Sequence, residues 1–440
     1  MPAPLRLRPL VCEVVIPQTE HPHSYERQLM KKNTILAHGS AFLAAAVLAG
    51  CAPFGGEAPG AASASSCPAA VYQDASVDLS GYQTPDGIAI VVANTANSPA
   101  PTLSGTASAL VEDLMTDQTL PTLWSATGNP SQIRVPLQTI SATNSRKKNQ
   151  TRVANNLVRI DDAIKTTPST PGMSLFEGIG VALDALASQG VSSPWIILVG
   201  SGLDDTGPMT TTTGILGEDP ARVADRVAAT NPGMRLDGIT ILATSLGYTA
   251  PPQTPPSDAQ RQLISDTWDA TLTRLGATVV QDPLPAPACS VNSDQPVIPT
   301  ELPEITVKCE AQKLTYELPS ALLFGGDSAE LRQNVAALLD EPVQILLDNP
   351  SAQVELVGHT ASTQETTDDQ SVQLSTRRAE AVATVLEAGG IDLSRITWRG
   401  VGDTEPRHED LNPDGTQNEH AAEERRVDLF ITGVASCPDR

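Results

Sequence analysis

The 440-residue sequence has few aromatic side chains and few cationic ones. The first shortage bears on the size of its domains, and the second on the class of its partners. Phe, Trp and Tyr make up 3% of the residues, whereas Pro (36) outnumbers Gly (31), which favours small domains joined by extended segments. The 28 Lys and Arg residues against 51 Asp and Glu residues give a net charge of −23. Because nucleic-acid binding requires clustered cations that displace phosphate counterions, no nucleic-acid partner is expected.

No hydrophobic run approaches the roughly 20 residues that a membrane-spanning helix requires. Residues 30–51 instead carry two early lysines, a short apolar stretch and the ending Leu48-Ala49-Gly50-Cys51. This segment resembles a bacterial lipoprotein signal peptide with a lipobox. The resemblance implies cleavage before Cys51, acylation of that cysteine, and a lipid anchor at the extracytoplasmic face of the cell membrane, or in the outer membrane of a diderm. An ordinary signal peptide followed by a chance cysteine is the alternative.

The small number of cysteines also bears on the compartment. Without Cys12 in the presequence and the lipidated Cys51, four cysteines remain, an even number that suits an oxidising environment. Each of two predicted pairs brackets a domain-sized region, and their spacings do not resemble a zinc site. The predicted disulfides are Cys67–Cys289 and Cys309–Cys437.

Composition divides the rest of the chain into two predicted domains and two connecting segments. Residues 52–70 are rich in Pro, Gly, Ala and Ser and read as a flexible tether, whereas residues 283–307 form a stiffer Pro-rich linker. The predicted domains span residues 71–282 and 308–437.

The first predicted domain alternates short apolar runs with amphipathic stretches. This pattern is typical of an α/β fold, a doubly wound parallel sheet covered by helices on both faces. The expected strands are 87–92, 194–199 and 238–243, and the expected helices are 151–165, 174–188, 220–229 and 258–275.

The first domain resembles the von Willebrand factor A domain, whose metal site begins with Asp-x-Ser-x-Ser after the first strand. The matching run 94–98 reads Asn-Thr-Ala-Asn-Ser, so an amide replaces the leading carboxylate. Ser174 stands at the Thr-like position and Ser201 at the place of a later Asp, with Asp204 and Asp205 close behind. Because a hard cation needs carboxylate oxygens, we expect a metal-free scaffold that acts as a spacer or binds a protein partner.

The second predicted domain has a mixed pattern of strands and helices that is typical of a smaller α+β fold. Strands are expected at 314–318, 353–358, 396–400 and 427–431, and one helix at 371–388 before Gly389-Gly390. Another helix is expected from an N-cap at Ser328, interrupted or kinked at Pro342. Its buried face would carry Leu331, Val335, Leu338 and Leu339.

Five motifs in order make the second domain resemble the OmpA-like C-terminal peptidoglycan-binding domain over about 120 residues. They are Phe324-x-x-x-Ser328-x-x-Leu331, Val357-Gly358-His359-Thr360, Leu374-Ser375-Thr376-Arg377-Arg378-Ala379, Gly400-Val401-Gly402 and Arg425-Arg426-Val427.

The resemblance implies a zwitterionic ligand, the diaminopimelate side chain of the peptidoglycan stem. The family binds its carboxylate with an Arg, matched here by Arg378, and its ammonium with an Asp, where this sequence has Ala361. Asp368 or Asp369 would replace that carboxylate, with Asp327 a more distant candidate. The alternatives are weak binding, binding of an amidated stem, or a domain that serves only in protein interactions.

The same motifs place Thr360 and Ser375 in the candidate binding site. His359 is expected to order the loop by hydrogen bonding, because no second histidine lies at metal-ligand spacing from it. The two adjacent arginines near the end, Arg425 and Arg426, would point to opposite faces of a strand and be partly structural, and Arg426 is the better candidate to face the ligand. An Arg378 that merely pairs with nearby acids on a solvated helix is the competing interpretation.

These features predict a non-enzymatic envelope lipoprotein that binds peptidoglycan and links it to the membrane, without a cofactor or metal. An adhesin or assembly partner acting through residues 71–282 is the main alternative. A wall hydrolase is less favoured, since the sequence contains neither Gly-x-Ser-x-Gly nor His-Glu-x-x-His.

Overall fold

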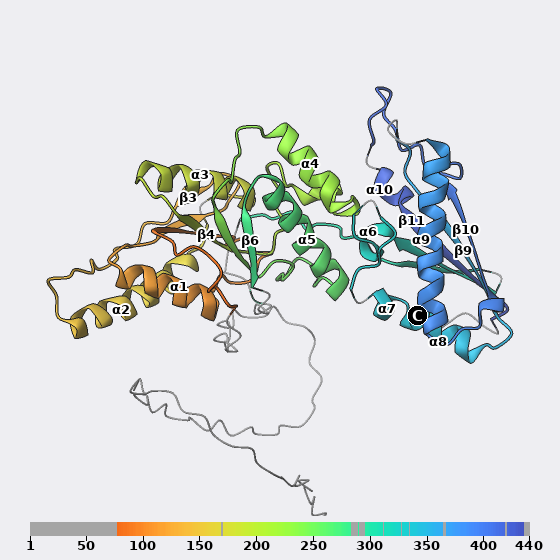
Figure 1. Ribbon diagram of the computed structural model, residues 1–440, viewed down its shortest axis with the longest axis horizontal. Helices are drawn as coiled ribbons and strands as arrows, with labels where there is room; N and C mark the ends of the chain where they lie inside the picture. The colour runs from red at the N-terminus through yellow and green to blue at the C-terminus, as the bar shows by residue number, and fades with distance from the viewer. Residues whose placement is uncertain are drawn as a thin grey trace, which may run out of the picture. The chain divides into compact units, whose positions relative to one another are not determined.

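The computed structural model describes residues 77–434, apart from residues 169, 283–288, 290–294, 311, 327, 334, 364–366 and 419. Cys51, the predicted lipid attachment site, and the signal segment 30–51 lie outside the described residues. Within them the chain forms two β-sheets, one largely parallel and one mixed, which confirms the mixed α/β class (Figure 1). The von Willebrand factor A-like assignment and the domain boundaries remain predictions.

The first sheet contains six strands in the order β3-β2-β1-β4-β5-β6. All neighbouring pairs are parallel except β2 and the two-residue β3, which are antiparallel. The strands are β1 (Gly87–Val92), β2 (Thr122–Ser125), β3 (Ser131–Gln132), β4 (Pro194–Val199), β5 (Thr240–Thr244) and β6 (Thr278–Asp282).

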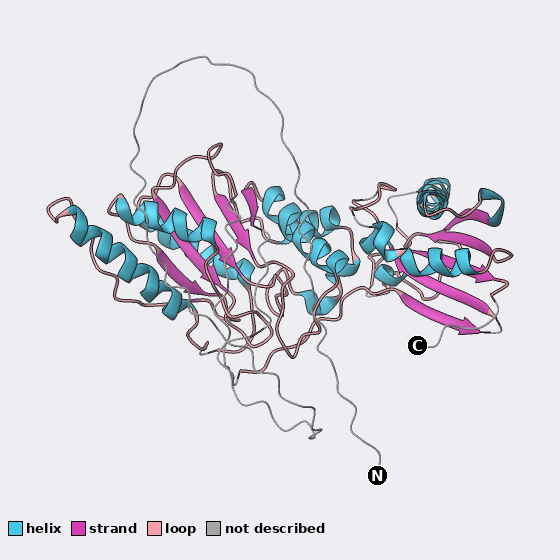
Figure 2. Ribbon diagram, turned by 90° about the horizontal axis from the view of Figure 1, so that it is seen from below, coloured by secondary structure: helices cyan, strands magenta, loops and turns pink. Residues whose placement is uncertain are grey.

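Helices cover both faces of this sheet, as the apolar runs of its strands require (Figure 2). Along β1, Ile88 and Ile90 face a core shared with α1 and α2, whereas Ala89 and Val91 face a core shared with α3, α4 and α5. The helices are α1 (Gly105–Thr116), α2 (Arg146–Ile164), α3 (Leu175–Ser188), α4 (Pro220–Thr230) and α5 (Asp258–Arg274), with the short 3-10 helices η1 (Thr211–Thr213) and η2 (Ile215–Gly217).

The second sheet has five strands in the order β10-β9-β11-β8-β7. The pair β9 and β10 is parallel, and the other neighbours are antiparallel. The strands are β7 (Thr306–Glu310), β8 (Lys313–Pro319), β9 (Gln353–His359), β10 (Ile396–Gly402) and β11 (Arg426–Thr432).

One long helix, α9 (Asp368–Ala388), lies across β9 and β10 and packs its Ala379, Val382 and Leu386 into the core of this sheet (Figure 1). It begins with a capping box between Thr367 and Gln370. The remaining elements are short: α6 (Ser320–Leu323), α7 (Val335–Leu338), α8 (Asp340–Asp348), η3 (Leu393–Arg395) and α10 (Ala421–Glu424).

The prediction that a helix begins after Ser328 is wrong, and so is the prediction that Pro342 kinks it. Ser328 closes a turn instead, donating its hydroxyl to Gly325 O and accepting from Glu330 N, and Leu331 bridges to Phe324 as an extended residue. The local side-chain bonds of a serine compete with a helix here. Pro342 does not kink a helix, because it stands in the first turn of α8, where no backbone N–H is needed.

Within the described residues, no helix is both long enough and apolar enough to cross a membrane.

The disulfide predictions fall partly outside the described residues, which include neither Cys67 nor Cys437. Cys289 and Cys309 are both disulfide-bonded. Which cysteines they pair with remains a prediction.

Candidate functional site

A pocket lies where β9 ends, beside the first half of α9. Two of the residues expected to bind the ligand, Thr360 and Arg378, both line it, as does Ala361. Other lining residues come from α9, from the chain just before β11, from the loop after β9 and from α4; among them are Ser371, Leu374, Arg377, Gln417, Arg425, Thr363 and Arg222. The fold therefore joins three of the five sequence motifs in one place.

Arg378 is a buried arginine whose position is set by the first motif. Its side chain is 4% exposed, and its Nε donates a hydrogen bond to the backbone oxygen of Ser328 at 2.9 Å. Its guanidinium carbon lies 5.2 Å from the centre of the Phe324 ring, a cation–π distance. A guanidinium held in this way offers the pocket a cation in a fixed orientation.

Thr360 contributes a hydroxyl that forms no hydrogen bond within the described part of the chain. Its backbone N–H donates to Gly402 O at 2.9 Å, which ties the end of β9 to the end of β10. Its Oγ1 is buried and has no hydrogen-bond partner among the described residues. Since a buried hydroxyl without a partner costs free energy, this atom is suited to bind a ligand in the pocket.

The loop that follows Thr360 is held by a buried carboxylate that the sequence analysis missed. Asp410 is 4% exposed, and its Oδ2 accepts a hydrogen bond from Ser362 N at 2.6 Å. Its backbone oxygen accepts from Asn418 N at 3.0 Å. Asp410 thus orders the chain directly after Ala361 from a position 49 residues later, for which no local sequence pattern gives a signal.

The charge of the pocket is one-sided. Four arginines line it, and no carboxylate of the described residues does; they are Arg222, Arg377, Arg378 and Arg425. Asp368 and Asp369, the expected replacements for the family's acid, lie exposed in the first turn of α9, where carboxylates complement the helix dipole. Asp327 lies outside the described residues. An anionic group is the ligand that such a lining favours.

Ser375, expected in the binding site, is not part of the pocket lining. Its Oγ accepts a hydrogen bond from Gly402 N at 2.9 Å and donates to Val372 O at 3.0 Å. Two residues of the Leu-Ser-x-x-Arg motif therefore have different roles: Ser375 attaches α9 to β10, and Arg378 lines the pocket.

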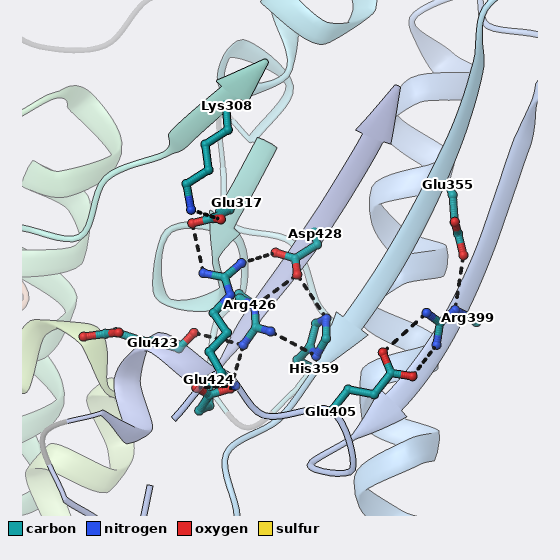
Figure 3. A network of polar contacts seen from close by, with 11 residues as sticks. Lys308, Glu317, Glu355, His359, Arg399, Glu405, Glu423, Glu424, Arg426 and Asp428 are labelled. Carbon is teal, nitrogen blue, oxygen red and sulfur yellow. Dashed lines mark hydrogen bonds and ion pairs between the residues drawn. The ribbon is translucent and has the colours of Figure 1, made fainter. Parts of the chain in front are cut away.

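His359, the last residue of β9, and Arg426 belong to a buried ionic network (Figure 3). His359 Nε2 lies 3.2 Å from Asp428 Oδ2, and its Nδ1 lies 3.4 Å from Arg426 Nη2. Arg426 pairs with Glu424 at 2.7 Å and with Asp428 at 3.1 Å. The side chain of His359 is thus held against β11, and an ordering role for it in the loop after β9 stays a prediction. Arg426, expected to face the ligand, lies in this network, whereas Arg425 lines the pocket.

The network extends outward through Arg407, which bonds Asp428 and Glu317 at 2.9 Å each. Burial opposes ionisation of Asp428, but the hydrogen bond from His359 and the charges of Arg426 and Arg407 outweigh it and lower its pKa. Burial likewise opposes ionisation of Glu424, and the N–H groups of Arg407 and His408 with the Arg426 side chain hold its pKa below the usual range. Both acids are therefore charged at neutral pH.

After β1, side chains of the segment 94–98 that resembles a metal site bond to one another and to Ser201 and Met173. Thr95 Oγ1 donates to Asn97 Oδ1 at 2.9 Å, and the hydroxyls of Ser98 and Ser201 lie 3.2 Å apart. Ser98 Oγ also donates to the thioether sulfur of Met173 at 3.3 Å. The groups gathered here are hydroxyls, an amide and a thioether.

The carboxylates near that segment support the start of α3. Ser174 caps the helix by accepting from Glu177 N at 3.2 Å, and Asp204 Oδ2 accepts from Phe176 N at 3.2 Å. Asp205 Oδ1 accepts from Met173 N at 2.5 Å. Burial raises the pKa of Asp204 well above its usual value.

Comparison with known proteins finds similarity in the C-terminal part of the chain. Residues 323–420 match the OmpA family. A probable lipoprotein, YiaD of Escherichia coli K12, is 28% identical over 128 residues, which are 29% of this chain and 55% of that protein. The photosystem I P700 chlorophyll a apoprotein A2 of Gloeobacter violaceus is 33% identical over 115 residues, 26% of this chain and 13% of that protein. The chain thus spans about half or less of the length of these curated relatives.

Two solved structures illustrate the similarity. The cell wall anchor of the T6SS from Pseudomonas aeruginosa is 27% identical, covers 29% of this chain and 87% of its own, and has a TM-score of 0.26. The peptidoglycan-associated lipoprotein of Burkholderia pseudomallei is 22% identical, covers 26% of this chain and 89% of its own, and has a TM-score of 0.22.

The family match includes the turn at Ser328, the pocket residues Thr360 and Arg378, and the loop held by Asp410. The resemblance inferred from the five motifs is thereby confirmed, and the C-terminal part of this chain is a domain of the OmpA family.

Proposed function

We propose that this protein binds peptidoglycan non-covalently through the pocket of its OmpA family domain, and that Arg378 holds a carboxylate of the diaminopimelate stem. The observation that carries the proposal is that the buried guanidinium of Arg378, held by Ser328, lines the same pocket as the Thr360 hydroxyl, which has no hydrogen-bond partner in the described chain. A planar guanidinium can bind a carboxylate with two parallel hydrogen bonds, and a neutral hydroxyl can supply a third.

The positive charge of the pocket indicates which part of the zwitterionic ligand it binds. Arg377 and Arg425 raise the local positive potential, and the lining supplied by the described residues contains no acid for an ammonium group. The carboxylate is therefore the part of the zwitterion that this pocket recognises. A stem whose side-chain amine is amide-bonded, as in a cross-link, would be bound nearly as well as a free one.

Anchoring in the envelope is part of the same proposal. Acylation at Cys51 would hold one end of the protein in a membrane while the OmpA family domain holds the wall, and the two attachments together would tolerate weak single-site affinity. The E. coli relative is described as a probable lipoprotein, which supports this arrangement. Incorporation of labelled palmitate into the wild-type chain, and its loss in Cys51→Ser, would test it.

The first sheet would act in this arrangement as a spacer of the von Willebrand factor A type or as a binding module for a protein partner. Disulfides Cys67–Cys289 and Cys309–Cys437 would join the ends of the two folded regions. Peptide mapping without reduction tests that pairing, and any other set of linked peptides would contradict it.

Sedimentation of the full chain with insoluble peptidoglycan tests the binding proposal. We expect the wild type to sediment, and Arg378→Ala to lose about 10-fold or more in affinity, since a charge-assisted hydrogen bond contributes roughly 1.5–3 kcal/mol. Arg378→Lys keeps the charge and loses the planar fork, so its affinity should fall between the two.

Arg399→Ala is the matched control, because this arginine is 47% exposed and pairs with Glu355 and Glu405 away from the pocket. It should sediment like the wild type. Thermal unfolding of each variant separates loss of the fold from loss of the ligand. Failure of the folded wild type to sediment would reject the proposal and direct attention to a partner of residues 71–282.

A further inference from the structure

Two histidines and a glutamate meet on the surface of the OmpA family domain, outside the pocket. His408 and His420 lie 12 positions apart in the sequence, and their rings face each other with centroids 4.8 Å apart. Glu423 lies beside both, with Oε2 3.5 Å from His408 Nε2 and Oε1 3.7 Å from His420 Nδ1. One ligand atom from each of the three residues lies within 4.8 Å of the others.

The backbone holds these side chains in place. His408 N donates to Glu424 Oε1 at 2.9 Å, which fixes His408 to α10, and Glu423 N donates to His420 O at 3.0 Å. The His420 Nδ1 atom is buried and has no hydrogen-bond partner among the described residues. A ring nitrogen in that state, facing a carboxylate and a second imidazole, is suited to accept a cation.

We propose that His408, His420 and Glu423 form a binding site for a divalent transition metal of the zinc class. Two imidazole nitrogens and one carboxylate oxygen are a ligand set that Zn²⁺ uses, whereas Mg²⁺ and Ca²⁺ prefer oxygen ligands alone. Bonds of about 2.0–2.2 Å in a tetrahedron separate ligand atoms by roughly 3.3–3.5 Å. The present separations need only small side-chain rotations, which the partial exposure of all three residues allows.

The metal would close the loop between residues 408 and 420 onto α10. That loop carries Asp410, which orders the chain after Ala361, and Gln417, which lines the pocket and accepts a hydrogen bond from Arg425. The ion would therefore stiffen one wall of the pocket. The site itself does not depend on the identity of the pocket's ligand, so it can be tested without peptidoglycan.

Titration of the full chain with Zn²⁺ by calorimetry, after removal of metal with a chelator, tests the site. The wild type should bind one equivalent that the His408→Gln/His420→Gln double variant does not bind, and Glu423→Gln should bind about 10–100-fold more weakly. Glu380→Gln removes an exposed glutamate from α9 and should bind as the wild type does.

Two further readouts separate this site from adventitious binding. Co²⁺ in place of Zn²⁺ should give the intense visible absorption of a tetrahedral site in the wild type and not in the double variant. Zn²⁺ should also slow amide hydrogen exchange between residues 409 and 418. A double variant that is folded, as judged by circular dichroism, and that binds as much Zn²⁺ as the wild type would overturn the proposal.

Discussion

Gly358 of β9 lies directly against the backbone carbonyl of Ser375 in α9, so closely that a β-carbon at position 358 would overlap the Ser375 oxygen. Gly400 of β10 makes the same approach to Thr376 N and Ser375 Oγ. Gly358 and Gly400, each from one sequence motif, thus allow α9, which carries the Leu-Ser-x-x-Arg motif, to pack closely against the sheet. This contact sets how far α9 stands from the end of β9, and with it the position of Arg378.

Replacement of Gly358 by alanine should therefore destabilise the domain. The added methyl meets backbone atoms that have no room to move, so we expect a loss of about 2–4 kcal/mol in the free energy of unfolding. Urea denaturation measures it. Gly325→Ala is the control, because nothing lies within 4 Å of a β-carbon there, and it should cost less than about 1 kcal/mol. Equal losses in the two variants would show that α9 does not rest on β9 in this way.

Thr360→Val separates ligand binding from stability. The substitution removes a hydroxyl with no hydrogen-bond partner in the described chain and keeps the shape of the side chain. Stability should stay the same or rise by about 1 kcal/mol, since an unpartnered buried hydroxyl is costly. Affinity for peptidoglycan should fall about 3- to 10-fold in the sedimentation assay. A loss of stability without a loss of affinity would mean that the hydroxyl serves the fold.

Ala361→Asp restores the acid that the OmpA-like family uses for the ammonium group. The side chain at position 361 lines the pocket, so the new carboxylate would face the same ligand as Arg378. We expect binding to free diaminopimelate to strengthen about 10-fold, whereas binding to a stem acylated on its side-chain amine should not improve. Calorimetry with the two ligands measures the difference. Ala361→Ser, which adds no charge, is the control, and an equal gain in both ligands would contradict a charge effect.

Asp428→Asn should destabilise the buried network that supports His359. Breaking a buried ionic network by removal of one charge costs roughly 3 kcal/mol, because Arg426 and Arg407 lose their shared partner. The pKa of Asp428 in the folded protein lies below its usual value of 3.8, so the unfolded chain takes up the proton first as pH falls. The stabilising contribution is thus complete above about pH 5 and is lost as pH falls through the folded-state pKa.

Urea denaturation of wild type and Asp428→Asn across that pH range tests this prediction. The difference between the two proteins should be largest near neutrality and shrink in acid. Asp237→Asn removes an acid whose ion pair with Arg235 is largely exposed, and it should change stability by less than about 0.5 kcal/mol at each pH. A difference that does not vary with pH would show that Asp428 acts through packing.

Asp204→Asn should have the opposite pH dependence. Burial raises the pKa of Asp204, so the folded protein keeps its proton to higher pH than the unfolded chain does. Stability of the wild type therefore falls as pH rises from about 4 through the folded-state pKa. Asparagine can still accept from Phe176 N and carries no charge. Its advantage should therefore grow with pH by about 1.4 kcal/mol per unit between the pKa of Asp204 in the unfolded chain and its higher pKa in the folded protein. Chemical denaturation at pH 4 and pH 7 measures this, and an advantage that shrinks toward pH 7 would contradict it.

Several elements could be predicted because their evidence is local. The strands at Gly87–Val92 and Pro194–Val199 are continuous apolar runs, and they occur as expected. The long helix before Gly389 differs from its expected bounds by three residues at the start and none at the end. Among the elements not predicted are strands β2, β3, β6 and β7 and helix α1. The helix expected from Ser328 was wrong because the Ser328 hydroxyl bonds within its own turn and its backbone oxygen accepts from Arg378.

The sequence by itself determined the local elements, the order of the motifs and the family of the C-terminal domain, since periodicity and short motifs are carried by residues close in the chain. Only the tertiary structure decided which of two adjacent arginines lines the pocket, because Arg425 and Arg426 point to different surroundings as β11 begins. It alone brought Asp410 to Ser362 and His408 to His420 and Glu423. No local sequence pattern indicates these contacts, because they join segments that are distant in the chain. They form when α9 and the loops pack closely on one sheet.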